Sequence, residues 1–457
     1  MASSQEYDEK EVVDNCYEKL KDFDYIRFTF NDMSGTGRCK VVHQRHLKTT
    51  LESGIRSAGV TAIGSLGNKL PKDCLMMDNG CPDMLYLPQK GTCHALPWAG
   101  CGKYKVGEVL TDVHSLDRRY ADFSTRHAAM RQLRTLKEMG YEVLSAYELE
   151  YYIMKKDESG SYVSLYDKDE YESAFLWTKY EKFMYEIESN LFGAGINIEH
   201  MHTEYAGGQF EMTVPPETGV NSADTAILYK NGIKEILGLH EGYLATFMSK
   251  PIAKKAGSGC HFNHSLWKDG KPAFYDETKE HGLSDLARYF LAGQLKHARA
   301  LTAFLAPTYN CYRRIVCPFA APNIANWGID SRECYVRVKI GSSTGPYLEN
   351  RLGGAVANPY LVMASILAAG IDGVRHKMEL PEQKAQGPDV IRMPKSLEEA
   401  LKALEEDNDL KEILGKGLVE NYIRTKRGVE VKMFNSDVGQ ESAEDIEKER
   451  QFYMDLL

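Results

Sequence analysis

The spacing of hydrophobic residues changes along the chain and divides it into two parts. Residues 9–21 place apolar side chains at helical intervals and predict a short amphipathic helix. After it, Ile26, Phe28 and Phe30 alternate with more polar positions, which is the period of a strand. The turn-forming residues 32–37 then allow a second strand to return beside the first. Residues 22–110 are therefore expected to form a small β-rich unit.

The second part, residues 120–455, mixes strands with longer helices and predicts an α+β fold. Residues 124–140 read as an amphipathic helix that Ser124 caps and Gly140 closes. The acidic run from Glu441 to Glu449 is expected to be a solvated helix face and no more, and residues 376–394 a loop. Further helices are expected near 168–192, 221–248, 284–305 and 358–374 and from Leu397 onward.

Composition narrows the class of protein. A length of 457 residues exceeds the usual size of one domain, so two domains are expected. The net charge of −9 argues against a nucleic-acid partner, because such proteins usually present a basic face to phosphates. No apolar run approaches the roughly 20 residues that span a bilayer. The polar, acidic start lacks the pattern of a secretory signal, and the ten cysteines form no CxxC pair. We expect a cytoplasmic protein with reduced thiols.

Two pairs of glutamates carry the first candidate chemistry. Glu148 and Glu150 are two residues apart in a strand-like run, so both side chains leave the same face. Such neighbours repel unless one is protonated or a cation lies between them; a solvent-facing strand edge is the alternative. Glu204 and Glu211 flank a Gly207-Gly208 turn that can aim both at one point. Carboxylates of this kind suit Mg²⁺ or Mn²⁺, although an acidic loop beside a strand would also contain them.

Two further motifs are less specific on their own. A glycine-rich stretch at 257–259 precedes His261, and glycine lets the backbone approach a ligand closely. A lone histidine is nevertheless more often a core residue than a ligand. Between residues 308 and 351, Glu349 shares strand parity with Arg351. The arginines of this region can bind carboxylates or phosphates, or they can form surface salt bridges.

The order and content of these motifs resemble glutamine synthetases of the bacterial type over roughly residues 20–440. Residues 357–361 (ANPYL) and 369–373 (AGIDG) add to the match, and residues 30–35 and 96–98 fit the small domain of that family. Residues 327–330, 348–354 and 263–267 are closer to two side branches. These are the γ-glutamyl-amine ligases and lengsin, a lens protein regarded as lacking synthetase activity.

The resemblance implies an N-terminal β-grasp domain at 22–110 and a catalytic domain at 120–455, built of antiparallel strands with helices outside. It also implies a homo-oligomer with active sites between neighbouring subunits, expected as a dodecamer of two hexameric rings. In such a site ATP phosphorylates the γ-carboxylate of glutamate or a similar acid, and ammonia or another amine then displaces phosphate.

The resemblance also implies roles for individual residues. Two divalent ions, Mg²⁺ or Mn²⁺, would each take three ligands: Glu150, Glu204 and Glu211 for the first, and Glu148, His261 and Glu349 for the second. The substrate-binding residues would be Arg314, Arg351, Gly257 and His261; the nucleotide-binding residues Ser265, Arg332 and Arg337; and the catalytic residues Arg314 and Arg337.

Several positions depart from the family pattern. Two carboxylates of the ammonium site are replaced, near Ile63 and at Ala320, which favours an amine other than ammonia. A phosphate-site histidine, a phosphate-site arginine and a glutamate-binding asparagine are also replaced, at Asn263, Tyr347 and Ala256. These losses leave open a lengsin-like protein that does not catalyse and binds other proteins, cytoskeletal ones included. We favour the enzyme, because the whole metal-ligand set is present.

Overall fold

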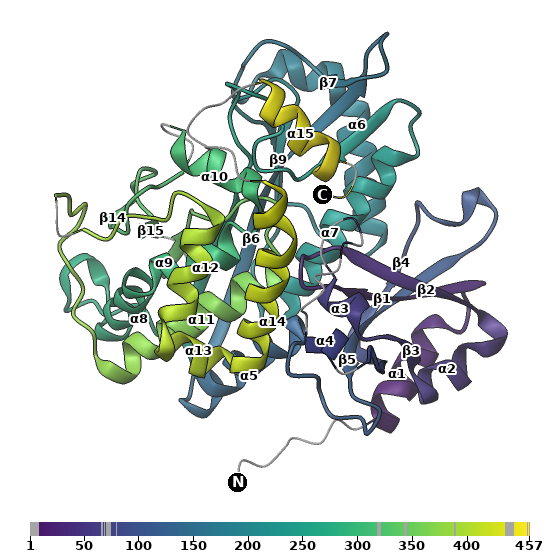
Figure 1. Ribbon diagram of the computed structural model, residues 1–457, viewed down its shortest axis with the longest axis horizontal. Coiled ribbons are helices and arrows are strands. Elements are labelled where there is room, and N and C mark those ends of the chain that lie inside the picture. The colour runs from purple at the N-terminus through teal and green to yellow at the C-terminus, as the bar shows by residue number, and fades with distance from the viewer. Residues whose placement is uncertain are drawn as a thin grey trace.

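The computed structural model describes residues 9–64, 67, 69, 75–78, 80–317, 321–341, 345–387, 390–434, 443–454 and 456. They form two units, a smaller N-terminal one and a larger one that carries the remaining elements (Figure 1). Within these residues, no helix has both the length and the apolar character needed to span a membrane. The fold is mixed α and β, as the sequence predicts.

A five-stranded sheet forms the N-terminal unit. Its strand order is β2-β1-β5-β4-β3, and among the described pairs of this sheet only β1 and β5 run parallel. One face is covered by α1 (Glu9–Leu20) and α2 (Leu47–Ser53), with Cys16, Ile26 and Phe28 in the small core between them. The strands are β1 (Tyr25–Asn31), β2 (Gly37–His43), β3 (Ile55–Ala58), β4 (Asp83–Ala95) and β5 (Val106–His114), with the short helices α3 (Val60–Ile63) and α4 (Leu75–Asp78) between them.

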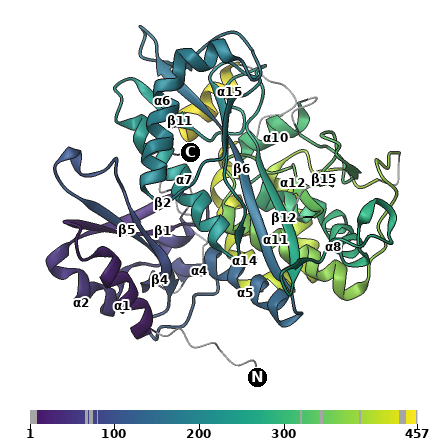
Figure 2. The same ribbon diagram turned by 180° about the vertical axis from the view of Figure 1, so that it is seen from behind.

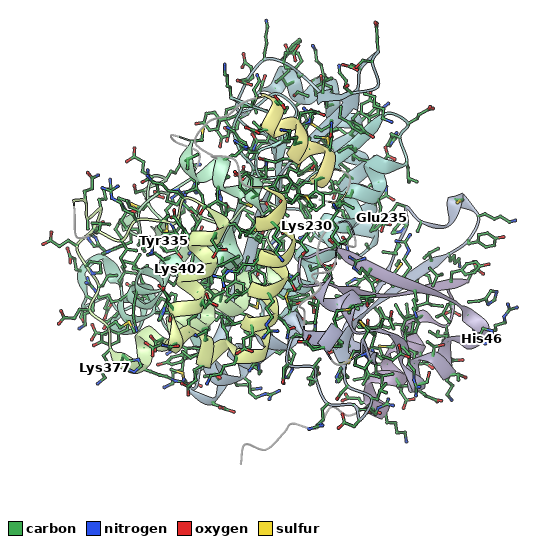
Figure 3. The ribbon with its side chains drawn as sticks, in the orientation of Figure 1. His46, Lys230, Glu235, Tyr335, Lys377 and Lys402 are labelled. Atoms are coloured by element: carbon green, nitrogen blue, oxygen red, sulfur yellow. The ribbon has the colours of Figure 1, made fainter. Side chains whose placement is uncertain are left out.

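The opposite face of this sheet packs on the larger unit. Arg27 of β1 forms an ion pair of 2.7 Å with Glu235, and Trp98 donates from Nε1 to the same carboxylate at 2.8 Å. Figure 3 labels Glu235 where the two units meet. The limits proposed for the two domains, 22–110 and 120–455, stay predictions.

An eleven-stranded sheet runs through the larger unit. Its main path is β14-β15-β16-β12-β6-β9-β8, with β7, β10 and β11 paired to β6 and β13 paired to β12. In Figure 2 the long strands β6 and β12 cross the molecule side by side. The strands are β6 (Glu142–Lys156), β7 (Tyr162–Ser164), β8 (His200–Thr203), β9 (Gln209–Thr213), β10 (Glu217–Thr218), β11 (Tyr243–Thr246), β12 (Cys260–Lys268), β13 (Lys271–Pro272), β14 (Trp327–Ile329), β15 (Val336–Lys339) and β16 (Tyr347–Asn350).

Helices cover one face of this sheet. Every second residue of a strand lies on the same face, so the odd-numbered side chains of β6 point to one side of the sheet. Among them Tyr147, Leu149 and Tyr151 are buried on the side that the helices cover. The other face carries the charged residues. The helices are α5 (Thr125–Glu138), α6 (Ala174–Gly193), α7 (Asn221–Gly238), α8 (Asp285–Lys296), α9 (Ala298–Leu305), α10 (Tyr309–Val316), α11 (Pro359–His376), α12 (Leu397–Glu406), α13 (Asn408–Leu414), α14 (Lys416–Lys426) and α15 (Ala443–Tyr453).

Three predicted helices have different limits. α6 begins only at Ala174, because the Ser173 side chain accepts from the Leu176 amide and caps the helix. The helix expected over 221–248 ends at Gly238, and residues 243–246 pair with β6 as β11. The helix expected over 284–305 breaks at His297, so it forms α8 and α9. Periodicity alone does not reveal such ends.

The prediction that residues 441–449 form only a solvated helix face is wrong at Glu449. Residues 441 and 442 of this run lie outside the described residues. α15 begins at Ala443, and Glu449 is 1% exposed. The Glu449 carboxylate accepts from Arg313 and Asn310, each at 2.7 Å. A buried carboxylate needs such partners, which lie too far along the chain for local sequence to reveal.

His297, at the break between α8 and α9, joins three helices through its ring. Its Nδ1 lies 2.6 Å from Asp407 and its Nε2 lies 2.8 Å from Asp372, and the side chain is 1% exposed. Burial lowers the pKa of His297, but hydrogen bonds and charge from the two aspartates outweigh burial, so the pKa is raised. Both ring nitrogens donate only when the ring is protonated.

The two hydrogen bonds from the His297 ring to Asp407 and Asp372 predict that the stability of the fold depends on pH. A pKa raised in the folded state stabilises the fold fully below the unfolded value of 6.5, and this stability is lost as pH rises through the folded value. The variant His297→Gln is expected to unfold about 2 kcal/mol more easily at pH 5.5, with a smaller difference at pH 9. Urea unfolding across this range measures it, with His46→Gln on the exposed surface as control (Figure 3). If the difference in free energy of unfolding between wild type and His297→Gln does not change with pH, a protonated His297 does not stabilise the fold.

Candidate functional site

The charged face of the larger sheet gathers the candidate site residues mainly on five adjacent strands, β15, β16, β12, β6 and β9. His261 of β12 lies opposite Glu148 of β6, and Asn263 lies opposite Glu349 of β16. Arg337 of β15 in turn lies opposite Glu349. Directly opposed residues share a face, so this register brings together side chains that are far apart in the sequence.

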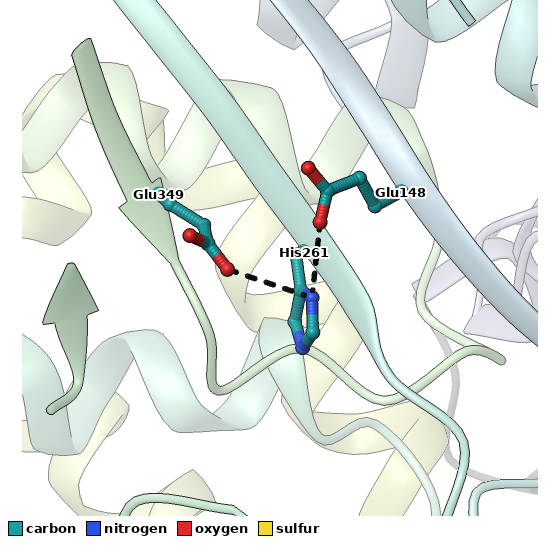
Figure 4. Close-up of side chains that lie close together, drawn as sticks. All are labelled: Glu148, His261 and Glu349. Carbon is teal, nitrogen blue, oxygen red and sulfur yellow. Dashed lines mark hydrogen bonds and ion pairs between the residues drawn. The ribbon is translucent and has the colours of Figure 1, made fainter. Parts of the chain in front are cut away.

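Glu148, His261 and Glu349 form the first cluster, which Figure 4 shows around the imidazole ring. His261 Nδ1 lies 3.4 Å from a Glu148 oxygen and 3.7 Å from a Glu349 oxygen. These are the three residues that the sequence assigns to the second ion. Burial and the nearby Arg351 lower the pKa of His261 to about 3, so the ring is neutral and its unprotonated nitrogen can bind a metal ion.

Glu150 and Glu211 extend the cluster on β6 and β9. The two residues are directly paired across the strands, and with His261 they bring ligand atoms within 4.8 Å of one another. The Glu150 Oε2 atom accepts from the Gly259 amide at 2.9 Å and from Gln209 at 3.0 Å. These two hydrogen bonds fix the carboxylate, and its Oε1 atom faces His261 at 3.9 Å.

Glu204 joins Glu211 through a residue that sequence reasoning missed, His202. The ligand atoms of these three residues lie within 4.8 Å of one another. His202 Nε2 is 3.3 Å from Glu211, and Nδ1 is 3.8 Å from Glu204. The two-residue spacing of His202 and Glu204 was the available signal, because strand parity places both on one side.

The carboxylates of this second cluster hold protons unusually strongly. Burial, together with the charges of Glu150 and Glu211, raises the pKa of Glu204 to about 8. Burial also raises the pKa of Glu211 to about 7, against the hydrogen bond from His202. The hydrogen bond with Glu211 raises the pKa of His202 to about 9.

Two arginines neutralise the carboxylate of Glu349 on β16. Arg337 Nη1 lies 3.2 Å from one Glu349 oxygen, and Arg351 forms an ion pair with the other. Arg337 also bonds Asp330 at 2.6 Å. Glu349, 2% exposed, is therefore held between two guanidinium groups and His261.

Arg314 lies beneath the glycine-rich segment that the sequence singles out. Its Nη1 donates to the carbonyls of Leu352 and Gly353 at 2.8 and 3.1 Å, and its Nε has no hydrogen-bond partner among the described residues. A β-carbon at Gly257 would come within 2.9 Å of the Arg314 side chain, so only glycine lets the segment approach it this closely.

The residues expected at the nucleotide are more dispersed. Ser265 is buried on β12, and its hydroxyl accepts from Trp267 at 3.0 Å. The Arg332 side chain is exposed, while its carbonyl accepts from Arg351 at 3.1 Å. Arg337 is the one residue of the expected nucleotide set that contacts the glutamate cluster.

The substituted positions have new surroundings. Asn263 donates to Glu148 at 2.9 Å, and its Oδ1 atom has no partner among the described residues. His264 faces the other side of β12, as strand parity predicts, where it contacts Gln294 at 2.8 Å. Tyr347 is half-buried, Ala256 is half-buried and Ile63 is fully buried. Ala320 lies outside the described residues.

The donor set fits divalent ions. Hard oxygen ligands with an imidazole are the chemistry that Mg²⁺ and Mn²⁺ accept. A bound cation would favour the ionised forms of Glu204 and Glu211, whose pKa values burial raises. The residues that would hold the ions are Glu148, Glu150, Glu204, Glu211, Glu349 and His261, with His202 beside them.

Metal binding is predicted to strengthen as pH rises. Protons compete with the ion for Glu204 and Glu211, so between pH 6 and 8 the affinity for Mn²⁺ should grow on the order of tenfold per pH unit for each proton displaced. The rise in melting temperature on adding Mn²⁺ reports this affinity.

Two variants bracket this prediction. Glu211→Gln should show a smaller Mn²⁺ shift at every pH, and Glu158→Gln, on the exposed turn after β6, should behave as wild type. A Mn²⁺ shift that is independent of pH, or unchanged in Glu211→Gln, would show that the ion binds elsewhere.

Comparisons with known proteins agree with this geometry. The family described as glutamine synthetase, catalytic domain, matches residues 122–446. A glutamine synthetase of Methanococcus maripaludis is 31% identical over 434 residues, which cover 90% of this chain and 93% of that protein. One of Thermotoga maritima is 31% identical over 411 residues, covering 87% and 91%.

Solved structures extend the agreement to the whole fold. Ligand-free GmaS superimposes with a TM-score of 0.80 at 27% identity, over 94% of this chain and 98% of that one. Its complex with ADP gives the same TM-score and identity, over 95% and 99%. Since the family match spans most of the sequence and the relatives align along almost all of it, the chain belongs to the glutamine synthetase family of ligases.

Proposed function

We propose that the protein is an ATP- and divalent-metal-dependent ligase that joins the γ-carboxylate of glutamate, or of a similar acid, to an amine through an acyl phosphate. The observation that carries this proposal is the convergence of five glutamates and His261 on one face of the sheet, next to Arg314 and Arg351. Bound divalent ions would supply charge neutralisation for the transferring phosphoryl group.

Arg314 and Arg351 are the residues proposed to bind the acid substrate. Arg314 is buried, and backbone carbonyls accept from its Nη1. Its Nε, which has no hydrogen-bond partner among the described residues, leaves a donor for a carboxylate. Arg351 lies across Glu349 from Arg337. Gly257 and His261 would border the same substrate, because Gly257 packs on Arg314.

Arg337, Arg332 and Ser265 are the proposed contacts for ATP. The similar GmaS structure solved with ADP supports a nucleotide in this fold. The γ-carboxylate of the acid attacks the γ-phosphorus of ATP, and ADP leaves. Arg337, which already faces the site from β15, would stabilise the negative charge of that transfer.

The amine then attacks the acyl carbon, a proton is released, and phosphate leaves. Ammonium would need carboxylates to hold its charge, and the position near Ile63 instead offers a buried apolar side chain. An organic amine is therefore the preferred acceptor over ammonia. We further propose a cytoplasmic homo-oligomer, as a dodecamer, whose subunits divide into domains at 22–110 and 120–455.

A lengsin-like protein without catalysis is the second candidate. What favours it is the state of the phosphate-side positions, where Asn263 is bonded to Glu148 and Tyr347 carries no positive charge. Under this alternative the ring assembly and metal site persist, and the surface binds other proteins, with cytoskeletal partners as candidates.

Phosphate release decides between the two candidates. With ATP, Mg²⁺ or Mn²⁺, glutamate and a panel of amines that includes ammonia, we expect turnover to depend on both acid and amine. Glu349→Gln should lower kcat about 10²- to 10³-fold, because it removes a charged ligand of the site, whereas Glu158→Gln should not. A wild-type protein that binds Mn²⁺ but turns over no amine would favour the lengsin-like function.

A further inference from the structure

The C-terminal helix α15 lies against α10, the helix that carries Arg314, although the two are far apart in the sequence (Figures 1 and 2). The contact is made by Glu449, which is buried although the sequence predicts a solvated helix face there. The Glu449 side chain is 2% exposed, and the Arg313 side chain opposite is fully buried. A buried ion pair of this kind holds its two elements in one relative position, since separating them leaves a charge without compensation.

Both oxygens of the Glu449 carboxylate are used. Oε1 accepts from Arg313 Nε at 2.7 Å, with Nη2 of the same guanidinium also at 2.7 Å. Oε2 accepts from Asn310 Nδ2 at 2.7 Å. The two partners are one helical turn apart on α10, so the carboxylate fixes both the position and the rotation of this eight-residue helix.

Asn310 connects Glu449 to the segment 249–259 through hydrogen bonds. Its Oδ1 accepts from the Lys250 amide at 2.7 Å, and its Nδ2 also donates to the Lys250 carbonyl at 3.0 Å. A side chain that bonds both backbone groups of one residue sets the path of the chain there. The neighbouring carbonyl, of Ser249, then accepts from the Ser258 amide at 2.8 Å.

This segment ends at the candidate site. The Gly259 amide donates to Glu150 at 2.9 Å, and Gly257 packs on the side chain of Arg314. Arg314 itself follows Arg313 on α10. Two routes therefore lead from Glu449 to the site, one along α10 to Arg314 and one through Asn310 and the 249–259 segment to Glu150.

We propose that Glu449 is a positioning residue, through which the C-terminal helix sets the placement of Arg314 and of the 249–259 segment and so the affinity for the acid substrate. The identity of that substrate rests on the proposed function; the mechanical coupling does not. Glu449 lies outside the glutamate cluster and touches none of the candidate ligands or substrate contacts within the described part of the chain.

The test compares three variants of the full-length protein. Glu449→Gln keeps the size of the side chain and removes its charge. Glu449→Asp keeps the charge but moves it away from α10, because the side chain is shorter by one methylene group. If Glu449→Gln does not fold, Glu449→Asp is compared with wild type instead. Glu444→Gln, on the exposed side of the same helix, is the matched control.

Hydrogen–deuterium exchange measures the coupling without any turnover. Both Glu449 variants should exchange faster than wild type in residues 249–259 and 309–316, and Glu444→Gln should not. In steady-state assays the KM for glutamate should rise roughly 3- to 30-fold, while kcat and the KM for ATP should change less. A residue that only held α15 in place would not produce that split.

The outcomes separate the two proposals. Faster exchange confined to α15, or equal changes in both KM values, would overturn the positioning role. Faster exchange in 249–259 in a protein that turns over no amine would uphold the coupling and overturn the proposed reaction. In that case calorimetric titration with glutamate reads the coupling directly, and an affinity unchanged by Glu449→Gln would count against the substrate part of the proposal.

Discussion

Bringing five carboxylates onto one largely buried face of a sheet is the constraint around which the larger unit is organised. Like charges in a low dielectric repel strongly, so each must be compensated locally. The protein compensates Glu349 with two arginines, Glu150 with a backbone amide and Gln209, and Glu211 with His202. Arginines and hydrogen bonds therefore share the role that the sequence analysis gives to a proton or a cation between neighbouring carboxylates.

The parts of the site that follow from local geometry were predictable. Pairs two residues apart, such as Glu148 with Glu150 and Glu349 with Arg351, share a face of any strand, and the neighbours His261 and Asn263 likewise lie on that face. The opposite orientation of His264 follows from the same rule. The family assignment, and with it the fold, was also within reach, because it rests on several ordered motifs.

What could not be predicted depends on partners distant in the sequence. Cross-strand register decides that His261 meets Glu148 and that Arg337 meets Glu349, and no local pattern contains it. Likewise, Glu449 reads as one more exposed acid in a charged run, yet its partner Arg313 lies 136 positions away. The limits of α7 and the break at His297 are similarly set by tertiary contacts rather than by periodicity.

The tethering of Glu150 has a consequence for ion selectivity. One oxygen of this carboxylate is occupied by the Gly259 amide and Gln209, so the residue can offer a cation a single oxygen and cannot chelate through both. Calcium favours six to eight oxygen ligands and often takes two from one carboxylate, whereas magnesium needs only six at short distance. If Glu150 is a metal ligand as proposed, a carboxylate held in this way would disfavour the larger ion, and backbone hydrogen bonding at a glycine would contribute to discrimination between alkaline-earth metals.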